Sequence, residues 1–142
     1  MSVPGAPRPP ARYRRGARRT DLRSPPLPTS LDLALTAASA ASSKQARDVI
    51  VLDVSEPLVI SDYFVICSGN SDRQLEALDR EIVDQLRNNE HVRPRQREGS
   101  AQSGWILLDY GDVVVHIFSA SEREFYHLED LWSAAPTVVR MQ

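Results

Sequence analysis

Asp109, Asp112 and His116 are the residues with the greatest potential for chemistry, because two carboxylates and an imidazole follow one another around a predicted turn. Such groups ligate metals, and a magnesium site combines carboxylates with the phosphates of a substrate. In a hairpin whose two-residue turn is 110–111, Asp109 pairs with Asp112, and Trp105 pairs with His116. His116 then lies about 13 Å along the strand from Asp112, at ~3.3 Å per residue, which is too far to share one ion. The sequence therefore predicts no metal site and no cofactor.

The same hairpin could instead recognise a partner. Trp105, Leu107 and Val114 share the hairpin face that carries Asp109 and His116, whereas the opposite face is wholly aliphatic and is expected to be core. An apolar face without a covering helix marks a partner site, and acidic residues at its rim favour a basic partner. The alternative is that a helix covers this face and that Trp105 belongs to the core. The pattern alone leaves both readings open.

Motifs for phosphate binding or nucleophilic catalysis are absent, since GxxxxGK[ST], GxGxxG and GxSxG do not occur. Residues 67–71 (Cys-Ser-Gly-Asn-Ser) precede a predicted helix and could offer amides to an anion at its N-terminus. The simpler interpretation is that Gly69 only turns the chain. Cys67 ends an apolar segment and is expected to be a small buried hydrophobe.

Strands and helices alternate in a way that predicts a sheet with helices packed against it. Residues 49–52 and 63–67 are continuous apolar segments, which is typical of central strands covered on both faces. Residues 92–98 carry a proline and three arginines, which suits an exposed edge strand. With the hairpin, the predicted fold is an α/β domain with a mixed sheet of about five strands flanked by helices.

Three helices are expected, and each has a predicted inward stripe. The first runs from a capping box at Thr29 to about Ala46, the second begins at Ser71, and the third runs from Ser121 to Pro136. The inward stripes are Leu31, Leu35 and Ala38 in the first helix, Leu75, Leu78, Ile82 and Leu86 in the second, and Phe125, Leu128 and Trp132 in the third.

Charge divides the 142-residue chain into unlike parts. The first 30 residues hold seven arginines, seven prolines and one acid, and therefore carry about +6, whereas the remaining 112 residues carry about −8. We expect residues 1–28 to be a disordered arm, residues 29–136 to form the domain and residues 137–142 to be a C-terminal tail. The arm could contact ribosomal RNA, although a solvated tail is the simpler interpretation.

Composition also excludes several classes of protein. One cysteine rules out a disulfide scaffold and a multi-cysteine zinc site, and it suits a reducing compartment. No apolar run approaches the ~18 residues of a membrane span, and the N-terminus lacks the apolar region of a secretory signal. The expectation is a soluble cytoplasmic protein with no membrane partner.

Several segments together resemble the Iojap family, also described as the ribosomal silencing factor (RsfS) family. The resemblance extends from about Lys44 to Trp132, and its order and spacing are specific. The segments that carry it are Asp48–Val54, Ser61–Gly69 with Arg73 and Gln74, Arg97–Gly99, Trp105–His116, and Arg123, Tyr126, Leu128, Glu129, Leu131 and Trp132.

The resemblance implies a nucleotidyltransferase-like fold without the catalytic apparatus, and hence no enzyme and no catalytic residue. It implies binding to the large ribosomal subunit through its protein fourteen, on the face that meets the small subunit. Binding there would sterically block subunit association and repress translation under nutrient limitation. A homodimer is a further expectation for the family.

The resemblance also favours an exposed binding face on the hairpin, because the family's recognition surface includes the tryptophan-containing strand. The candidate partner-binding residues are Trp105, Leu107, Asp109, Tyr110, Asp112 and His116. The alternative function is a nucleotidyltransferase-like enzyme that uses a metal-bound nucleotide through Asp109, Asp112 or Asp53.

Overall fold

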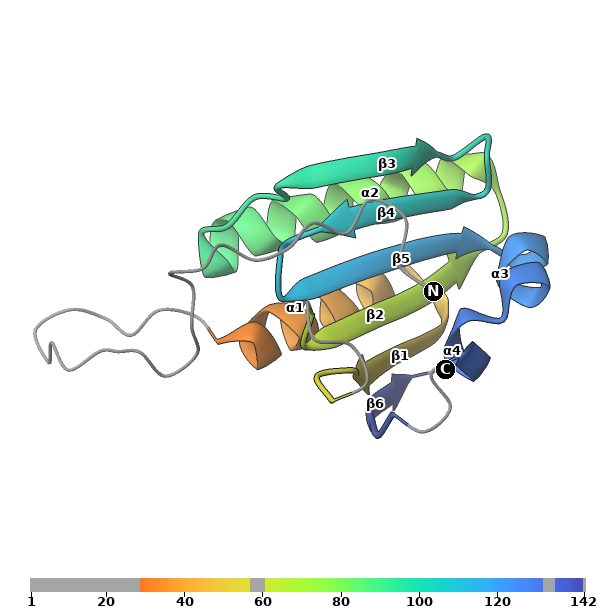
Figure 1. Cartoon of the computed structure of the whole chain (residues 1–142). Coiled ribbons are helices and arrows are strands. Elements are labelled where there is room, and N and C mark those ends of the chain that lie inside the picture. Colours follow the sequence, from red (N-terminus) through yellow and green to blue (C-terminus); the bar gives the residue numbers. More distant parts are fainter. Residues whose placement is uncertain (1–28, 57–60, 132–134, 142) are drawn as a thin grey trace, which may run out of the picture.

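A six-stranded sheet forms the centre of the computed structural model, which describes residues 29–56, 61–131 and 135–141 (Figure 1). The strands are β1 (Arg47–Asp53), β2 (Tyr63–Gly69), β3 (Gln96–Ser100), β4 (Trp105–Asp109), β5 (Val113–Ser119) and β6 (Thr137–Met141). Their order across the sheet is β3-β4-β5-β2-β1-β6. β2 and β5 run parallel, and the other neighbouring strands run antiparallel. The predicted mixed α/β fold is therefore confirmed.

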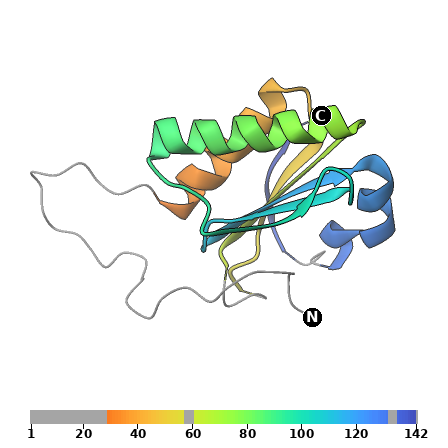
Figure 2. The same ribbon diagram turned by 90° about the horizontal axis from the view of Figure 1, so that it is seen from above.

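Helices α1 (Ser30–Ser43) and α2 (Asp72–Gln85) lie side by side over one face of the sheet (Figures 1 and 2). The stripe predicted for α2 is confirmed, since its four apolar side chains, Leu75, Leu78, Ile82 and Leu86, are fully buried. Leu86 opens a single π-helical turn, Leu86–Glu90, which continues the helix beyond α2. This face of the sheet holds the larger core of the domain.

The inward face predicted for α1 is wrong in part. The capping box at Thr29 is present, but Leu31 and Leu35 are each 36% exposed. The buried side chains are Leu33, Ala34, Ala37, Ala38, Ala40 and Ala41. Alanines on this face let the helix backbone approach the sheet and α2 closely, whereas a larger side chain there would hold them apart. The leucine spacing therefore did not predict which face of α1 packs against the sheet and α2.

Strands β1 and β2 are apolar on both faces, as predicted. Residues 49–52 of β1 and 64–69 of β2 are buried. Cys67 is a free, fully buried thiol within β2, and burial raises its pKa to about 12. It therefore behaves as a small hydrophobe, as expected.

The C-terminal tail expected at residues 137–142 is instead a strand over most of its length. β6 pairs antiparallel with β1, with Val51 opposite Val139 and Ile50 opposite Arg140. The chain reaches this edge after Pro136, whose carbonyl accepts a hydrogen bond from the Asp53 amide at 2.9 Å. The sequence Thr-Val-Val-Arg-Met is rich in β-branched residues, which suits a strand. The sheet therefore has one strand more than the five expected.

Helices α3 (Ala120–Tyr126) and α4 (Leu128–Leu131) follow β5 at one end of the sheet, away from α1 and α2 (Figure 2). The predicted inward stripe is confirmed at Leu128, which is 3% exposed, and is wrong at Phe125, which is 75% exposed. The N-cap is Ser119 rather than Ser121, and the helix ends at His127, whose φ is +49°, so Phe125 and Leu128 lie on different helices and do not share one stripe. Trp132, like the predicted arm at 1–28, lies outside the described residues.

Within the described part of the chain, no helix has the length and hydropathy that crossing a lipid bilayer requires.

Candidate partner-binding surface

The β4–β5 hairpin forms with the predicted faces but with a shifted register. Trp105 lies opposite Phe118 and Leu107 lies opposite His116, so the pairing differs by two residues from the one expected. The turn residues are Gly111 and Asp112, because the Tyr110 amide on one side of them donates a hydrogen bond to the Val113 carbonyl on the other side at 2.8 Å. Gly111 has a φ of +92°, which is the conformation that this turn demands and that glycine adopts at little cost. A shift of two residues leaves every side chain on its predicted face.

The hairpin therefore presents two different faces. Ile106, Leu108 and Val115 belong to the core beneath α1 and α2. On the opposite face, Leu107, Val114 and Phe118 belong to a second apolar cluster, with Trp105 packed at its side. We refer to this second face of the sheet as the aromatic face.

Aromatic rings form a connected group along the aromatic face. The Trp105 ring lies 4.9 Å from Phe118 and 4.6 Å from Tyr126 of α3, measured between ring centroids. His116 stacks with Phe118 at 6.2 Å and meets Phe64 edge-on at 4.7 Å. Rings from β5 and α3 thus contact Trp105 directly, and Phe64 of β2 packs against His116 next to it.

A hydrogen bond fixes the orientation of Trp105. Its indole Nε1–H donates to Nδ1 of His116 at 3.2 Å. Indole only donates, so Nδ1 of His116 must be the acceptor and the imidazole proton must sit on Nε2. His116 is fully buried, and burial lowers its pKa to about 3. His116 is therefore a neutral acceptor that positions Trp105, and it is shielded from direct contact with a partner.

Asp109 is a buried carboxyl at the end of β4. Its Oδ1 accepts a hydrogen bond from the Gly111 amide at 2.7 Å and so holds the turn. Its Oδ2 is buried without a hydrogen-bond partner. Burial raises the pKa of Asp109 to about 6, although the hydrogen bond from Gly111 and the nearby Arg95 act in the opposite direction. Near neutral pH this carboxyl therefore carries a charge that is readily lost.

The remaining candidate residues occupy structural positions. Tyr110 lies in the core on the helix-covered side, where burial raises the pKa of its hydroxyl above the ordinary range. Asp112 is 7% exposed, and its carbonyl accepts hydrogen bonds from the Asp62 amide at 2.7 Å and the Tyr63 amide at 3.1 Å. Of the six candidates, Trp105 is the one that is partly exposed, while the other five are buried.

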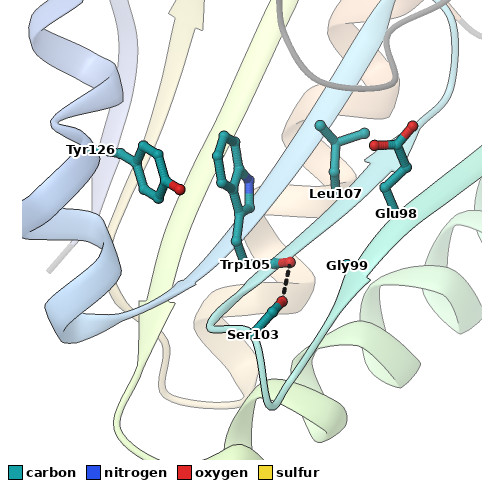
Figure 3. A pocket seen from close by; sticks show the side chains of 6 residues that line it. All are labelled: Glu98, Gly99, Ser103, Trp105, Leu107 and Tyr126. Carbon is teal, nitrogen blue, oxygen red and sulfur yellow. Dashed lines mark hydrogen bonds between the residues drawn. The ribbon is translucent and has the colours of Figure 1, made fainter.

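A shallow groove of about 190 Å³ lies beside Trp105 on the aromatic face (Figure 3). Its lining residues are Glu98, Gly99, Ser103, Trp105, Leu107 and Tyr126. Trp105 stands between Tyr126 on one side and Leu107 with Glu98 on the other, as Figure 3 shows. The groove is thus largely apolar, with one carboxylate at its edge.

Glu98 and Tyr126 are groove residues that were absent from the predicted site. Glu98 lies on β3 opposite Leu107, and Tyr126 ends α3, so the two are brought together only by the fold. Both stand in segments that carried the family resemblance, and this was the one signal that could have identified them.

The two other sites considered from the sequence gain no support. At the start of α2, the Gln74 side chain accepts a hydrogen bond from the Asn70 amide at 2.7 Å, so the helix end satisfies its own donor. Among the described residues, no group of three or more His, Cys, Asp or Glu side chains could hold a metal ion. Asp53, the third acid of the enzyme alternative, ends β1, where its carboxylate accepts a hydrogen bond from the Ser55 hydroxyl at 2.6 Å.

Comparisons with known proteins agree on one family. A family model described as ribosomal silencing factor during starvation matches residues 27–142. The ribosomal silencing factor RsfS of Bacillus subtilis (strain 168) is 46% identical over 100 residues, which cover 70% of this chain and 84% of that protein.

More distant similarity extends to an animal protein and to a solved structure. The Mus musculus protein named mitochondrial assembly of ribosomal large subunit protein 1 is 35% identical over 95 residues, which cover 63% of this chain and 40% of that protein. A crystal structure of a protein from Chromobacterium violaceum aligns with a TM-score of 0.70 at 30% identity, over 74% of this chain and 87% of that chain.

Proposed function

Because the chain belongs to the family of ribosomal silencing factors (the Iojap family), we propose that it binds the large ribosomal subunit and prevents it from joining the small subunit. The direct partner is the subunit's protein fourteen, on the face that meets the small subunit. A protein seated there blocks subunit association sterically, makes and breaks no bond, and represses translation when nutrients are limiting. The name of the mouse relative, which refers to assembly of the large subunit, supports a large-subunit partner.

The observation that carries this proposal is the partly exposed Trp105 beside a groove, on the face of the hairpin opposite α1 and α2. Interfaces depend on a few aromatic anchors set in well-packed surroundings. Trp105 fits that role because the hydrogen bond to His116 and the ring of Phe118 orient it before any partner arrives. A side chain that is already ordered loses little entropy on binding.

The buried candidates support this anchor in different ways. Leu107 lines the groove next to Trp105, and His116 holds the indole in place. Asp109 holds the hairpin turn through the Gly111 amide, and the Asp112 carbonyl joins that turn to the start of β2. Tyr110 fixes the hairpin from the opposite side of the sheet.

The charge of the domain suits a basic protein partner better than RNA. Outside its first 30 residues the chain carries about −8, which attracts a basic ribosomal protein and repels phosphates. The arginine-rich arm, residues 1–28, is proposed to make at most an accessory contact with ribosomal RNA.

The test is co-sedimentation of the full chain with separated ribosomal subunits. The proposal predicts binding to large subunits and none to small subunits. Trp105→Ala should weaken binding by over ~2 kcal/mol, as truncation of a central aromatic anchor does, while circular dichroism shows a folded protein. Equal binding to both subunits, or full binding by the folded variant, would refute the proposal.

A further inference from the structure

We propose that the groove beside Trp105 receives one arginine side chain of the partner, with its guanidinium paired to Glu98. This inference rests on the proposed function and specifies the chemistry of the same surface. It also assigns the attractive charge to a residue other than Asp109 and Asp112, the two acids that the sequence suggested.

The walls of the groove suit the stem and the plane of an arginine. Leu107 and the Trp105 ring form an apolar wall, and the Tyr126 ring lies against the other side of Trp105. The long stem of arginine covers apolar surface while its charged head stays near water. Its flat guanidinium stacks on aromatic faces, which attract cations through their electron-rich centres.

Glu98 supplies the charge at the edge of the groove. It is partly exposed on β3, and among the described residues it forms no ion pair. One carboxylate oxygen accepts a weak hydrogen bond of 3.4 Å from Gln96, which leaves acceptor capacity for an incoming donor. The Asp109 carboxyl lies close enough that the charge of Glu98 contributes to its raised pKa.

The backbone holds Glu98 and Trp105 close together before any partner binds. The neighbouring Gly99 has a φ of +82°, and a Cβ on this residue would collide with the Trp105 carbonyl oxygen. Only glycine permits this close approach of β3 to β4. The carboxylate and the indole are thus set on adjacent strands at a fixed separation, as the docking of a single side chain requires.

Arginine fits the groove better than the other chemistries a partner could offer. A purely apolar side chain would leave Glu98 desolvated without a partner, which is unfavourable. A phosphate would be repelled by the carboxylate. A lysine would satisfy the charge, but its compact ammonium neither stacks nor forms the two parallel hydrogen bonds that guanidinium forms with a carboxylate.

The test measures how tightly the full chain and its single variants bind isolated large ribosomal subunits. Glu98→Gln should weaken binding about tenfold, since a charge-assisted hydrogen bond is lost from a partly buried pair. Glu124→Gln is the matched control, because Glu124 is an exposed acid on α3 outside the groove, and it should change affinity less than about twofold. Equal affinities of the two variants would overturn the proposal.

Charge reversal distinguishes the alternative occupants. Glu98→Lys should weaken binding far more than Glu124→Lys if the occupant is cationic, and it should tighten binding if the occupant is a phosphate. Glu98→Gln should bind as well as the wild type or better if the occupant is apolar. If the wild type does not bind large subunits, the proposed function itself is wrong. If the wild type binds but Glu98→Gln binds equally well, the proposed function stands and only the arginine proposal is wrong.

Discussion

Acid should destabilise this protein through His116, and His116→Asn isolates that effect. In the folded protein the imidazole is neutral, because burial lowers its pKa from the ordinary 6.5 to about 3. In the unfolded chain the same group titrates near 6.5 and takes up a proton below that pH. Its Nδ1 accepts a hydrogen bond from Trp105, and the Asn side-chain oxygen can take over that role without titrating.

The size of the effect follows from the two pKa values. Between pH 6.5 and pH 3 the unfolded state binds more protons than the folded state, so stability is present above pH 6.5 and is lost as pH falls. At pH 5 the unfolded pKa lies about 1.5 units above the pH, and each unit corresponds to about 1.4 kcal/mol. Protonation of His116 in the unfolded chain should therefore lower the free energy of unfolding of the wild type by about 2 kcal/mol between pH 7 and pH 5.

Urea unfolding at pH 7, 6 and 5 measures this loss for both proteins. The difference in stability between wild type and His116→Asn should shrink by about 2 kcal/mol from pH 7 to pH 5. The contributions of the other titratable groups cancel in that difference, because both proteins contain them. A difference that stays constant with pH would refute the view that His116 is a buried neutral acceptor.

Three further predictions concern other features of the fold. Asp109→Asn should make stability rise more steeply with pH between 4 and 6. The raised pKa of Asp109 stabilises the wild type at low pH, and this stabilisation is lost as the pH rises through about 6, which opposes the gain at His116. Parallel urea titrations measure the two slopes, and identical profiles would count against a buried carboxyl. Deleting residues 137–142 should cost over about 2 kcal/mol, because β6 covers the edge of β1, and a variant as stable as the full chain would show that the strand adds nothing. Magnesium with nucleoside triphosphates should leave the melting temperature unchanged, whereas a reproducible rise would revive the enzyme alternative, since a ligand specific for the native state stabilises it.

Local sequence patterns were sufficient to predict the fold where periodicity and burial coincide. The α2 stripe, the two central strands and the two faces of the hairpin were predicted because each depends on neighbouring residues along one element. Alternation fixes which face a side chain occupies, and a register shift of two residues preserves it. This is why the faces were right while the cross-strand partners were wrong.

Features that depend on tertiary context were predicted less well. Leu31 and Leu35 have the spacing of a buried stripe, but the alanine face packs instead because it allows closer approach to the sheet. Residues 137–141 carry a strand-like composition, yet only the free edge of β1 makes them a strand. Glu98 and Tyr126 meet beside Trp105 from separate elements, and no spacing in the sequence predicts that meeting.

Subunit joining in vitro tests the central claim most directly. Purified large and small subunits are mixed at a magnesium concentration that permits association, with and without the full chain, and are separated on sucrose gradients. The proposed function predicts that the joined particle disappears in proportion to the protein added and persists with Trp105→Ala. Normal assembly of joined particles while the protein is bound to large subunits would contradict it.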